Sequence, residues 1–378
     1  MPFSKLGLTN SLTKNLTDSN YKKPYPIQQQ SIPAIIKGKD LLGIAQTGSG
    51  KTAAYVLPIL SILKPRKDGK NRNIDALVLV PTRELAIQVQ EVFKTYNISL
   101  KKPLNIKAVF GGVSINPQMK SLFGVNILIA TPGRLLELLR VNALSISKVK
   151  HLVIDEADKM LNIGFKEEMD EIVKLLPEKR QNLLFSATLS EKVKEINQLV
   201  LTKPIIVKIK AREEKIDLIQ QEAYFILNEN KGPLLRYIIK SQNIQQVLIF
   251  TSSKFKADNV AAKLRKHNIQ ATAVHSKKSQ GARTSALRKF KEGSLRVIVA
   301  TDLLARGIDI EFLPYVINYE LPRSPKDFIH RIGRTGRAEN PGKAITFVSN
   351  EEEQHFKLIQ KKIGNTIKTI DGDRLDLT

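Results

Sequence analysis

Residues 41–52 read LLGIAQTGSGKT, an apolar run that leads into a glycine-rich turn and then into the helix-like run AAYVLPILSIL. This is the layout of a phosphate-binding loop between a strand and a helix. Backbone N–H groups of Gly48, Ser49 and Gly50 can point at one phosphate chain, and the helix N-terminus adds a positive dipole. Lys51 can reach the β and γ phosphates, and the Thr52 hydroxyl can ligate Mg²⁺.

The loop departs from the strict pattern G-x-x-x-x-G-K-[ST] at one position, because Ala45 stands where the first glycine belongs. That glycine only eases a turn, so alanine is a mild departure. The alternative is an ordinary glycine-rich loop between strand and helix. The residues downstream decide between the two interpretations.

The composition limits the class of protein and indicates a polyanionic partner. The 378 residues suffice for two or three domains, and 42% hydrophobic residues allow a proper core. Lysine and arginine number 61 against 36 acidic residues, a net charge of +25. A polyanion is the natural partner for such an excess, and a solvated basic surface is the alternative that charge alone does not exclude. The absence of cysteine excludes disulfides, and no run is apolar enough to be a secretory signal or to span a bilayer. We expect a soluble, cytoplasmic protein.

Apolar β-rich runs alternate with helix-length amphipathic stretches through both halves of the chain. Strands that alternate with helices indicate a parallel sheet buried on both faces, whose ligands bind at the carboxyl ends of the strands. Most of the runs in the first half do end in small or polar residues: TGSGK, PTRELA, TPGR, DEAD and SAT. The rhythm breaks in a charged segment, which predicts domains at 1–205 and 219–378 joined by a linker at 206–218.

Two further motifs complete the chemistry of a nucleotide site. HLVIDEAD, residues 151–158, is an apolar strand that runs into carboxylates. Asp155 is placed to hold Mg²⁺ beside the phosphates, and Glu156 to orient and polarise an attacking water. HRIGRTGR, residues 330–337, offers Arg334 and Arg337 as arginine fingers. The alternatives are a helix-capping acidic group and a basic loop that faces solvent.

The ordered motifs resemble those of the DEAD-box RNA helicase family along nearly the whole chain. In the first half, the resemblance is carried by a Q motif within residues 1–29, AQTGSGKT, PTRELA, the pair Gly111–Gly112, TPGR, DEAD and SAT. In the second half it is carried by LIF, Gln280-x-x-Arg283, ATDLLARGIDI and HRIGRTGR. The resemblance implies two RecA-like domains, each a parallel β-sheet flanked by helices, joined by a short linker, with ATP and Mg²⁺ as cofactors.

The resemblance also implies which residues hold ATP. Gln28 would read the adenine edge bidentately, Tyr21 would stack on the ring, and Lys23 stands where a basic neighbour is usual. Two positions depart from the family: Asn20 replaces a glycine and Tyr25 a threonine. The remaining residues expected at the nucleotide are Thr47, Gly48, Ser49, Gly50, Lys51, Thr52, Gly307 and Asp309, with Thr52 and Asp155 at the metal.

RNA is implied as a partner that is held mainly by its sugar–phosphate backbone, with weak sequence preference and strong salt dependence. The residues that match the family's RNA positions are Arg83, Gly112, Thr131, Gly133, Arg134, Arg283, Thr301 and Asp302. For isolated members such as Thr131 or Arg283, a capping or salt-bridge role is a serious alternative. SAT is expected to couple the two sites, because the hydroxyls of Ser186 and Thr188 can hydrogen-bond Asp158 and His330.

These assignments predict a monomeric ATP-dependent RNA helicase whose two halves close around ATP and RNA. Closure would bring Arg334 and Arg337 to the phosphates at Lys51 and bend the bound strand. Two rival functions stay open: an ATP-locked RNA clamp with little unwinding, and a DNA-directed translocase. The cellular RNA target and protein partners do not follow from these motifs.

Overall fold

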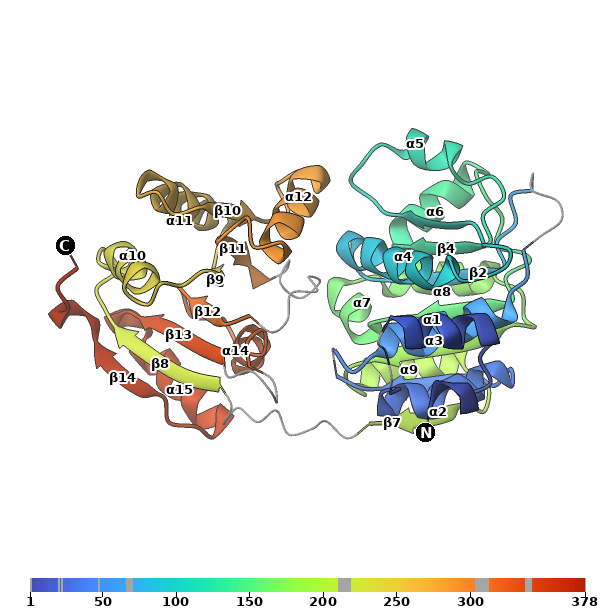
Figure 1. Cartoon of the computed structure of the whole chain (residues 1–378), viewed down its shortest axis with the longest axis horizontal. Helices are drawn as coiled ribbons and strands as arrows, with labels where there is room; N and C mark the ends of the chain where they lie inside the picture. Colours follow the sequence, from blue (N-terminus) through green and yellow to red (C-terminus); the bar gives the residue numbers. More distant parts are fainter. Residues whose placement is uncertain are drawn as a thin grey trace. The chain divides into compact units, whose positions relative to one another are not determined.

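The computed structural model describes residues 2–19, 21, 23–46, 48–65, 71–209, 219–302, 313–336 and 342–377. The chain divides into two compact units, Met1–Ala211 and Arg212–Thr378. Within the described residues, each unit has one sheet of seven strands, and every neighbouring pair of strands is parallel. Helices cover both faces of each sheet (Figure 1). The predicted class of two parallel α/β sheets is confirmed.

The sheet of the first unit has the strand order β3-β4-β2-β5-β6-β1-β7. Six of its strands are short apolar runs that the sequence predicted. Five of them are completely buried because helices cover both faces, and β3 at the edge is half buried. The strands are β1 (Leu41–Ile44), β2 (Ala76–Leu79), β3 (Ile106–Val109), β4 (Ile127–Ala130), β5 (His151–Ile154), β6 (Gln181–Ser186) and β7 (Ile205–Lys208).

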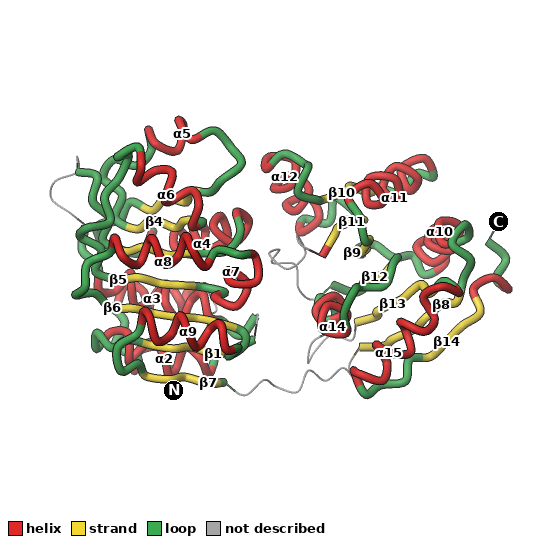
Figure 2. The backbone as a smooth tube through the Cα atoms, turned by 180° about the vertical axis from the view of Figure 1, so that it is seen from behind, coloured by secondary structure: helices red, strands yellow, loops and turns green. Residues whose placement is uncertain are grey.

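The helices of the first unit form a layer on each face of this sheet (Figure 2). One layer packs on the cluster around Tyr55 and Phe93. It contains α1 (Asn10–Asp18), α2 (Pro26–Ile36), α3 (Lys51–Ile62) and α4 (Arg83–Asn97), preceded by the 3₁₀ turn η1 (Phe3–Lys5). The other layer packs on the cluster around Leu135 and Met160. It contains α5 (Ile115–Lys120), α6 (Pro132–Arg140), α7 (Ala157–Ile163), α8 (Lys166–Leu175) and α9 (Glu191–Val200).

The second unit repeats this plan, with the strand order β10-β11-β9-β12-β13-β8-β14. Its strands are β8 (Ile219–Phe225), β9 (Val247–Thr251), β10 (Ala271–Val274), β11 (Val297–Thr301), β12 (Tyr315–Asn318), β13 (Gly342–Val348) and β14 (Lys368–Asp371). One face is covered by α10 (Lys231–Ser241) and α11 (Lys254–Lys266). The other is covered by α12 (Gln280–Lys291), α14 (Pro325–Ile332) and α15 (Glu353–Ile363), with short 3₁₀ turns at η3 (Asn350–Glu352) and η4 (Gly372–Arg374).

The predicted linker at 206–218 begins too early. Strand β7 pairs with β1 along its whole length, so residues 206–208 belong to the first sheet. Only Val207 of this strand is buried, and an edge strand of this kind carries no regular apolar pattern that the sequence could reveal. Residues 210–218 lie outside the described residues. Nowhere in the described part of the chain is a helix both long and apolar enough to cross a membrane.

Candidate functional site

The carboxyl ends of five neighbouring strands bring the predicted motifs of the first unit to one edge of its sheet. Leu79 of β2 pairs with Ala130 of β4 and Ile154 of β5, so PTRELA, TPGR and DEAD begin at the same level. Ile44 of β1 pairs with Ser186 at the end of β6, which puts the phosphate loop beside SAT. This edge is where parallel sheets bind their ligands.

The phosphate loop turns sharply into α3. Gly48 and Gly50 have φ of +75° and +87°, in the region that favours glycine. Lys51 is 7% exposed, and its amine donates to the backbone carbonyls of Ala45 at 2.6 Å and Gln46 at 2.9 Å. Burial lowers the pKa of Lys51, against the opposing pull of Asp155 and Glu156. A phosphate could take the place of the two carbonyls and restore full charge pairing.

The two acidic residues after β5 are held in different ways. Asp155 accepts the N–H of Glu156 on Oδ1 and the Tyr55 hydroxyl on Oδ2, both at 2.8 Å. Glu156 has a left-handed backbone, with φ of +51°, and pairs with Lys159 at 2.6 Å through Oε1. Its Oε2 is buried and has no hydrogen-bond partner among the described residues. Burial raises the pKa of both carboxyls, while nearby lysines lower it.

Tyr55 is a residue of this site that the sequence did not identify. It is fully buried on α3, four residues after Lys51, and its hydroxyl meets Asp155 and also the side chain of Thr52. It thus joins the two residues predicted to hold the metal. Helical spacing does place residue 55 on the same face as Lys51. However, a buried aromatic residue in an apolar helix is indistinguishable from ordinary core packing until the position of Asp155 is known.

The described residues fit a magnesium ion of the kind that nucleotides carry. Asp155 supplies carboxylate oxygen and Thr52 a hydroxyl, which are the hard oxygen donors that Mg²⁺ takes. Among the described residues, no group of three or more His, Cys, Asp and Glu side chains could cage a metal. Few protein ligands are expected for Mg²⁺ in this setting, because phosphates and water complete its shell.

The Q segment packs directly on the phosphate loop. The Gln28 amide nitrogen donates to the carbonyl of Gly50 at 3.0 Å and to the Tyr21 hydroxyl at 2.9 Å, and its oxygen accepts the N–H of Tyr25 at 3.0 Å. Gln28 is fully buried, so the predicted reading of adenine requires the Tyr21 hydroxyl to release it. The ring of Tyr21 packs at a tilt against the ring of Phe3, with centroids 5.3 Å apart, while Lys23 is exposed.

The predicted coupling segment is partly as expected. The Thr188 hydroxyl donates to Asp158 at 3.0 Å, which confirms one predicted bond. Ser186 instead donates to the backbone carbonyl of Thr188 at 2.8 Å, within SAT itself. Its short hydroxyl is fully buried at the end of β6, so it braces the turn that presents Thr188. His330 lies on α14 of the second unit.

The predicted RNA residues of the first unit converge on the loop after β3. Arg83 and Arg134 donate to the carbonyls of Gly112 at 3.3 Å and Val113 at 2.8 Å. A Cβ on Gly112 would lie 1.6 Å from the Arg83 guanidinium and displace it, and the φ of +73° also favours glycine here. A Cβ on Gly133 would meet nothing within 4 Å, so packing does not explain this glycine in the first turn of α6. Thr131 is the N-cap of α6 without a side-chain cap, which weakens the capping alternative.

In the second unit the predicted residues lie around the ends of β11 and α14. Thr301 ends β11, and Arg283 is buried on α12, where it bonds the side chain of Gln280. Arg334 is 8% exposed, and its carbonyl accepts the N–H of Leu313. Four predicted ATP residues lie outside the described residues: Thr47, Gly307, Asp309 and Arg337.

Arg331 is a second residue that sequence reasoning missed. It is 2% exposed and binds both carboxylate oxygens of Asp302, the Asn318 side chain and the carbonyl of Glu320. Its guanidinium also lies 5.0 Å from the ring centre of Phe250. Asp302 was predicted to contact RNA, but both of its carboxylate oxygens bind Arg331 within the second unit. Four basic residues within HRIGRTGR gave no sign that this one is structural.

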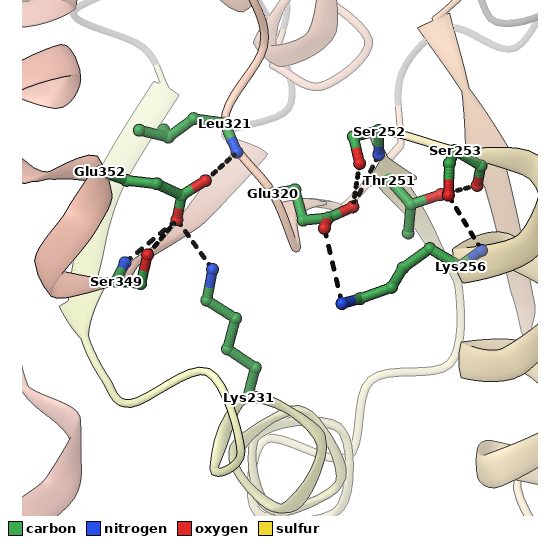
Figure 3. Close-up of polar contacts among 9 residues, drawn as sticks. All are labelled: Lys231, Thr251, Ser252, Ser253, Lys256, Glu320, Leu321, Ser349 and Glu352. Carbon is green, nitrogen blue, oxygen red and sulfur yellow. Dashed lines mark hydrogen bonds and ion pairs between the residues drawn. The ribbon is translucent and has the colours of Figure 1, made fainter.

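Polar pairs fix the loops at the same edge of the second sheet, as Figure 3 shows. Glu320 accepts the N–H and the hydroxyl of Ser252, both at 2.7 Å, which joins the ends of β12 and β9. Lys231 is 3% exposed and pairs with Glu352 at 2.8 Å. Although burial opposes it, the bond from Lys231 lowers the pKa of Glu352 below 4.5. These contacts tie together the segments that follow β8, β9, β12 and β13.

Comparisons with known proteins agree with this geometry. A family model described as DEAD/DEAH box helicase matches residues 25–196, and one described as helicase conserved C-terminal domain matches residues 230–339. The ATP-dependent RNA helicase CshA of Limosilactobacillus reuteri is 40% identical over 96% of this chain and 72% of its own length. The DEAD-box ATP-dependent RNA helicase CshA of Bacillus cereus is 38% identical over 99% of this chain and 70% of its own length.

Solved structures give the same result for the fold. S. cerevisiae Dbp5 bound to RNA and ADP BeF3 has a TM-score of 0.83 at 29% identity, over 98% of this chain and 96% of its own. A DEAD box protein from Methanococcus jannaschii has a TM-score of 0.54 at 33% identity, over 98% and 99% of the two chains. The predicted pair of RecA-like units is thereby confirmed.

Proposed function

The chain belongs to the DEAD/DEAH box helicase family, and we propose that it is an ATP-dependent RNA helicase. It hydrolyses ATP in an RNA-stimulated manner and locally unwinds or remodels short RNA duplexes and RNA–protein complexes. One observation carries the proposal: the buried Lys51 amine, held by carbonyls of the phosphate loop, interacts electrostatically with the carboxyls of Asp155 and Glu156 at the strand edge of the first sheet. The absence of cysteine is consistent with work in the reducing cytoplasm.

The residues of the first unit bind ATP and prepare the attacking water. Lys51 leaves the carbonyls of Ala45 and Gln46 for the phosphates, whose negative charge also restores its ordinary pKa. Glu156 holds the water through Oε2, the atom that has no bond among the described residues. Asp155 and Thr52 would hold Mg²⁺, which when bound neutralises charge on the β and γ phosphates.

The second unit completes hydrolysis in this proposal. Arg334 and Arg337 stabilise the charge that develops on the γ phosphate, while Gly307 and Asp309 approach the nucleotide. Such fingers from a separate folding unit make turnover depend on both units. Thr188 and Asp158 transmit the state of the nucleotide, with His330 as their proposed counterpart.

Two arginines of the first unit, Arg83 and Arg134, support RNA binding in this proposal. Arg134 is 5% exposed, and its Nη1 is buried without a hydrogen-bond partner among the described residues. A phosphate oxygen could accept a hydrogen bond from this buried Nη1 and from the backbone N–H groups in the first turn of α6, at Gly133. Arg83, Gly112 and Thr131 complete this half, and Arg283 with Thr301 extends the set in the second unit. Asp302 supports this set indirectly, because its carboxylate holds Arg331 inside the second unit.

The test is ATP hydrolysis with and without single-stranded RNA, together with strand release from a short RNA duplex. We expect hydrolysis to rise with RNA and strands to separate only with ATP. ATP-dependent binding without strand release would leave only an RNA clamp. Equal stimulation by DNA of the same length would overturn the choice of RNA.

A further inference from the structure

Helices α10 and α11 carry many basic side chains and very few acidic ones. They lie side by side on one face of the second sheet (Figures 1 and 2) and pack on the same apolar cluster. Within these two helices Asp258 is the one acidic residue, and it accepts from His275 at 3.0 Å and Lys278 at 2.8 Å. In α8 and α9 of the first unit, by contrast, bases and acids form pairs such as Lys166–Glu195.

The cations gather at the C-terminal halves of the two helices. Lys240 lies in the last turn of α10, and Lys263 and Lys266 lie in the last turn of α11; all three are exposed. In the part of the chain that the structure describes, none of these three lysines has an acidic partner within 4 Å. Helix α10 packs against α11. Burial and the charges of Arg236 and Lys240 lower the pKa of His267, which follows the end of α11. The acid Asp373 bonds Leu227 and Asn230, at the opposite end of α10.

Exposed aromatic rings interrupt this basic surface. Phe255 is 78% exposed at the start of α11, and Tyr237 is 39% exposed on α10. Phe255, Asn259, Lys263 and Lys266 follow one another at helical spacing and so line one side of α11. Cations interleaved with exposed rings are the pattern on which single-stranded nucleic acids bind, through phosphate charge and base stacking.

We propose that this basic stripe, made of Arg236, Tyr237, Lys240, Phe255, Lys263 and Lys266, binds single-stranded RNA outside the helicase motifs. The inference rests on the RNA binding of the proposed function and extends it to a surface that carries no motif. The stripe begins beside Ser253, at the strand edge where the motif residues lie, and runs down α11 to the opposite edge. RNA that leaves the motif residues would continue along it.

The length of α11 makes the proposal quantitative. From Ser253 to Lys266 the helix rises roughly 20 Å at about 1.5 Å per residue. If the nucleotides of a stacked single strand are about 3.4 Å apart, about six additional nucleotides cover that distance. A short RNA therefore fills only the motif residues, whereas a longer one also reaches the stripe.

The cations also have a structural explanation, because lysines near a helix C-terminus interact favourably with its dipole. That explanation accounts for Lys240, Lys263 and Lys266 one by one. It does not account for the exposed rings, or for the presence of only one acidic residue, Asp258, within the two helices. The two explanations differ in one measurable respect: a helix-end role leaves RNA affinity unchanged.

The test compares two triple variants of the full chain, K240Q/K263Q/K266Q in the stripe and K357Q/K361Q/K362Q on α15, which covers the other face. Binding of single-stranded RNAs of about eight and about 30 nucleotides is titrated by fluorescence anisotropy at several salt concentrations, with a non-hydrolysable ATP analogue. Each phosphate contact to a single strand contributes about 0.7 to the slope of log K against log salt. We expect the stripe variant to lower this slope by about 2 for the long RNA only.

The control variant should keep the wild-type slope with both RNAs, and Phe255→Ala should weaken the long RNA several-fold. An unchanged slope in the stripe variant would overturn the inference. The basic residues would then serve to bind an acidic protein or to stabilise the helix ends. Equal losses in both triple variants would reduce it to an effect of net charge. Loss with the short RNA would also contradict it. Wild-type protein that binds neither RNA would instead refute the proposed function.

Discussion

At the scale of single residues, Glu156 combines features that packing alone does not explain. A left-handed backbone is uncommon for a residue other than glycine, and here it lies between the end of β5 and α7. The turn places Oε1 on Lys159 and leaves Oε2 buried without a bond among the described residues. Strain of this kind persists mostly where it serves a site, which supports the role of Glu156 in holding water.

The variant Glu156→Gln should therefore bind ATP normally and lose turnover by about 100-fold or more, the usual contribution of a general base. Since burial already raises the pKa of Glu156, a neutral amide of the same shape should not harm the fold. Fluorescent-nucleotide binding and phosphate release measure the two effects separately. Glu178→Gln, an exposed change of the same kind, serves as the control. RNA-stimulated hydrolysis at the wild-type rate would refute the assignment.

Tyr25 occupies the N-cap of α2 without a side-chain cap, a position that favours Ser, Thr, Asp or Asn. The side chain of Gln28 accepts the N–H of Tyr25, and the N–H of Gln28 donates to the carbonyl of Tyr25. Tyr25→Thr should thus be about 1 kcal/mol more stable than Tyr25→Ala. Denaturant unfolding of the two variants measures the difference. Equal midpoints would show that the start of α2 needs no cap.

At the scale of elements, the sequence predicted the strands whose apolar residues directly reflect burial on both faces. Each central strand is an apolar run because helices cover both of its faces. The edge strands β7 and β14 were missed for the same reason, since Ile206 is 63% exposed and Lys368–Asp371 is largely exposed. The pairing of an edge strand depends on its neighbour in space. Tyr55 and Arg331 were missed likewise, because their roles depend on partners far along the chain.

The contact between α10 and the start of α15 gives an element-scale prediction about pH. The ordinary pKa of the Glu352 carboxyl is 4.5, and the bond from Lys231 lowers it in the folded state. A depressed carboxyl pKa stabilises the fold above the unfolded value, and that stability is lost as pH falls through the folded value. The stability advantage of wild type over Glu352→Gln should be full above about pH 5.5 and should shrink below pH 4.5. Unfolding by urea across this range measures it, and an advantage independent of pH would contradict the assignment.

At the scale of the whole molecule, the division into two units could be read from the repeated rhythm of strands and helices. The residues expected at ATP are likewise divided, with Lys51, Asp155 and Glu156 in one unit and Arg334 in the other. Each unit gathers its own set at a strand edge, because both sheets are parallel. The sequence could not show which arginines of HRIGRTGR are structural and which act on the nucleotide. Arg331 is bound on all sides within its unit, whereas the roles of Arg334 and Arg337 belong to the complete reaction.

Arg334→Gln is the variant that tests whether turnover needs both units. Nucleotide binding should stay at the wild-type level, because the phosphate loop and the Q segment lie in the first unit. The turnover number should fall about 1,000-fold, since an arginine finger acts on charge that develops only in the transition state. Arg334→Lys should recover little, because an ammonium cannot reproduce the two-pronged bond. Arg323→Gln, an exposed arginine of the same unit, is the matched control. If both glutamine variants hydrolysed ATP equally well, or if Arg334→Gln lost nucleotide affinity in proportion to its rate, hydrolysis would depend on the first unit alone or on the fold.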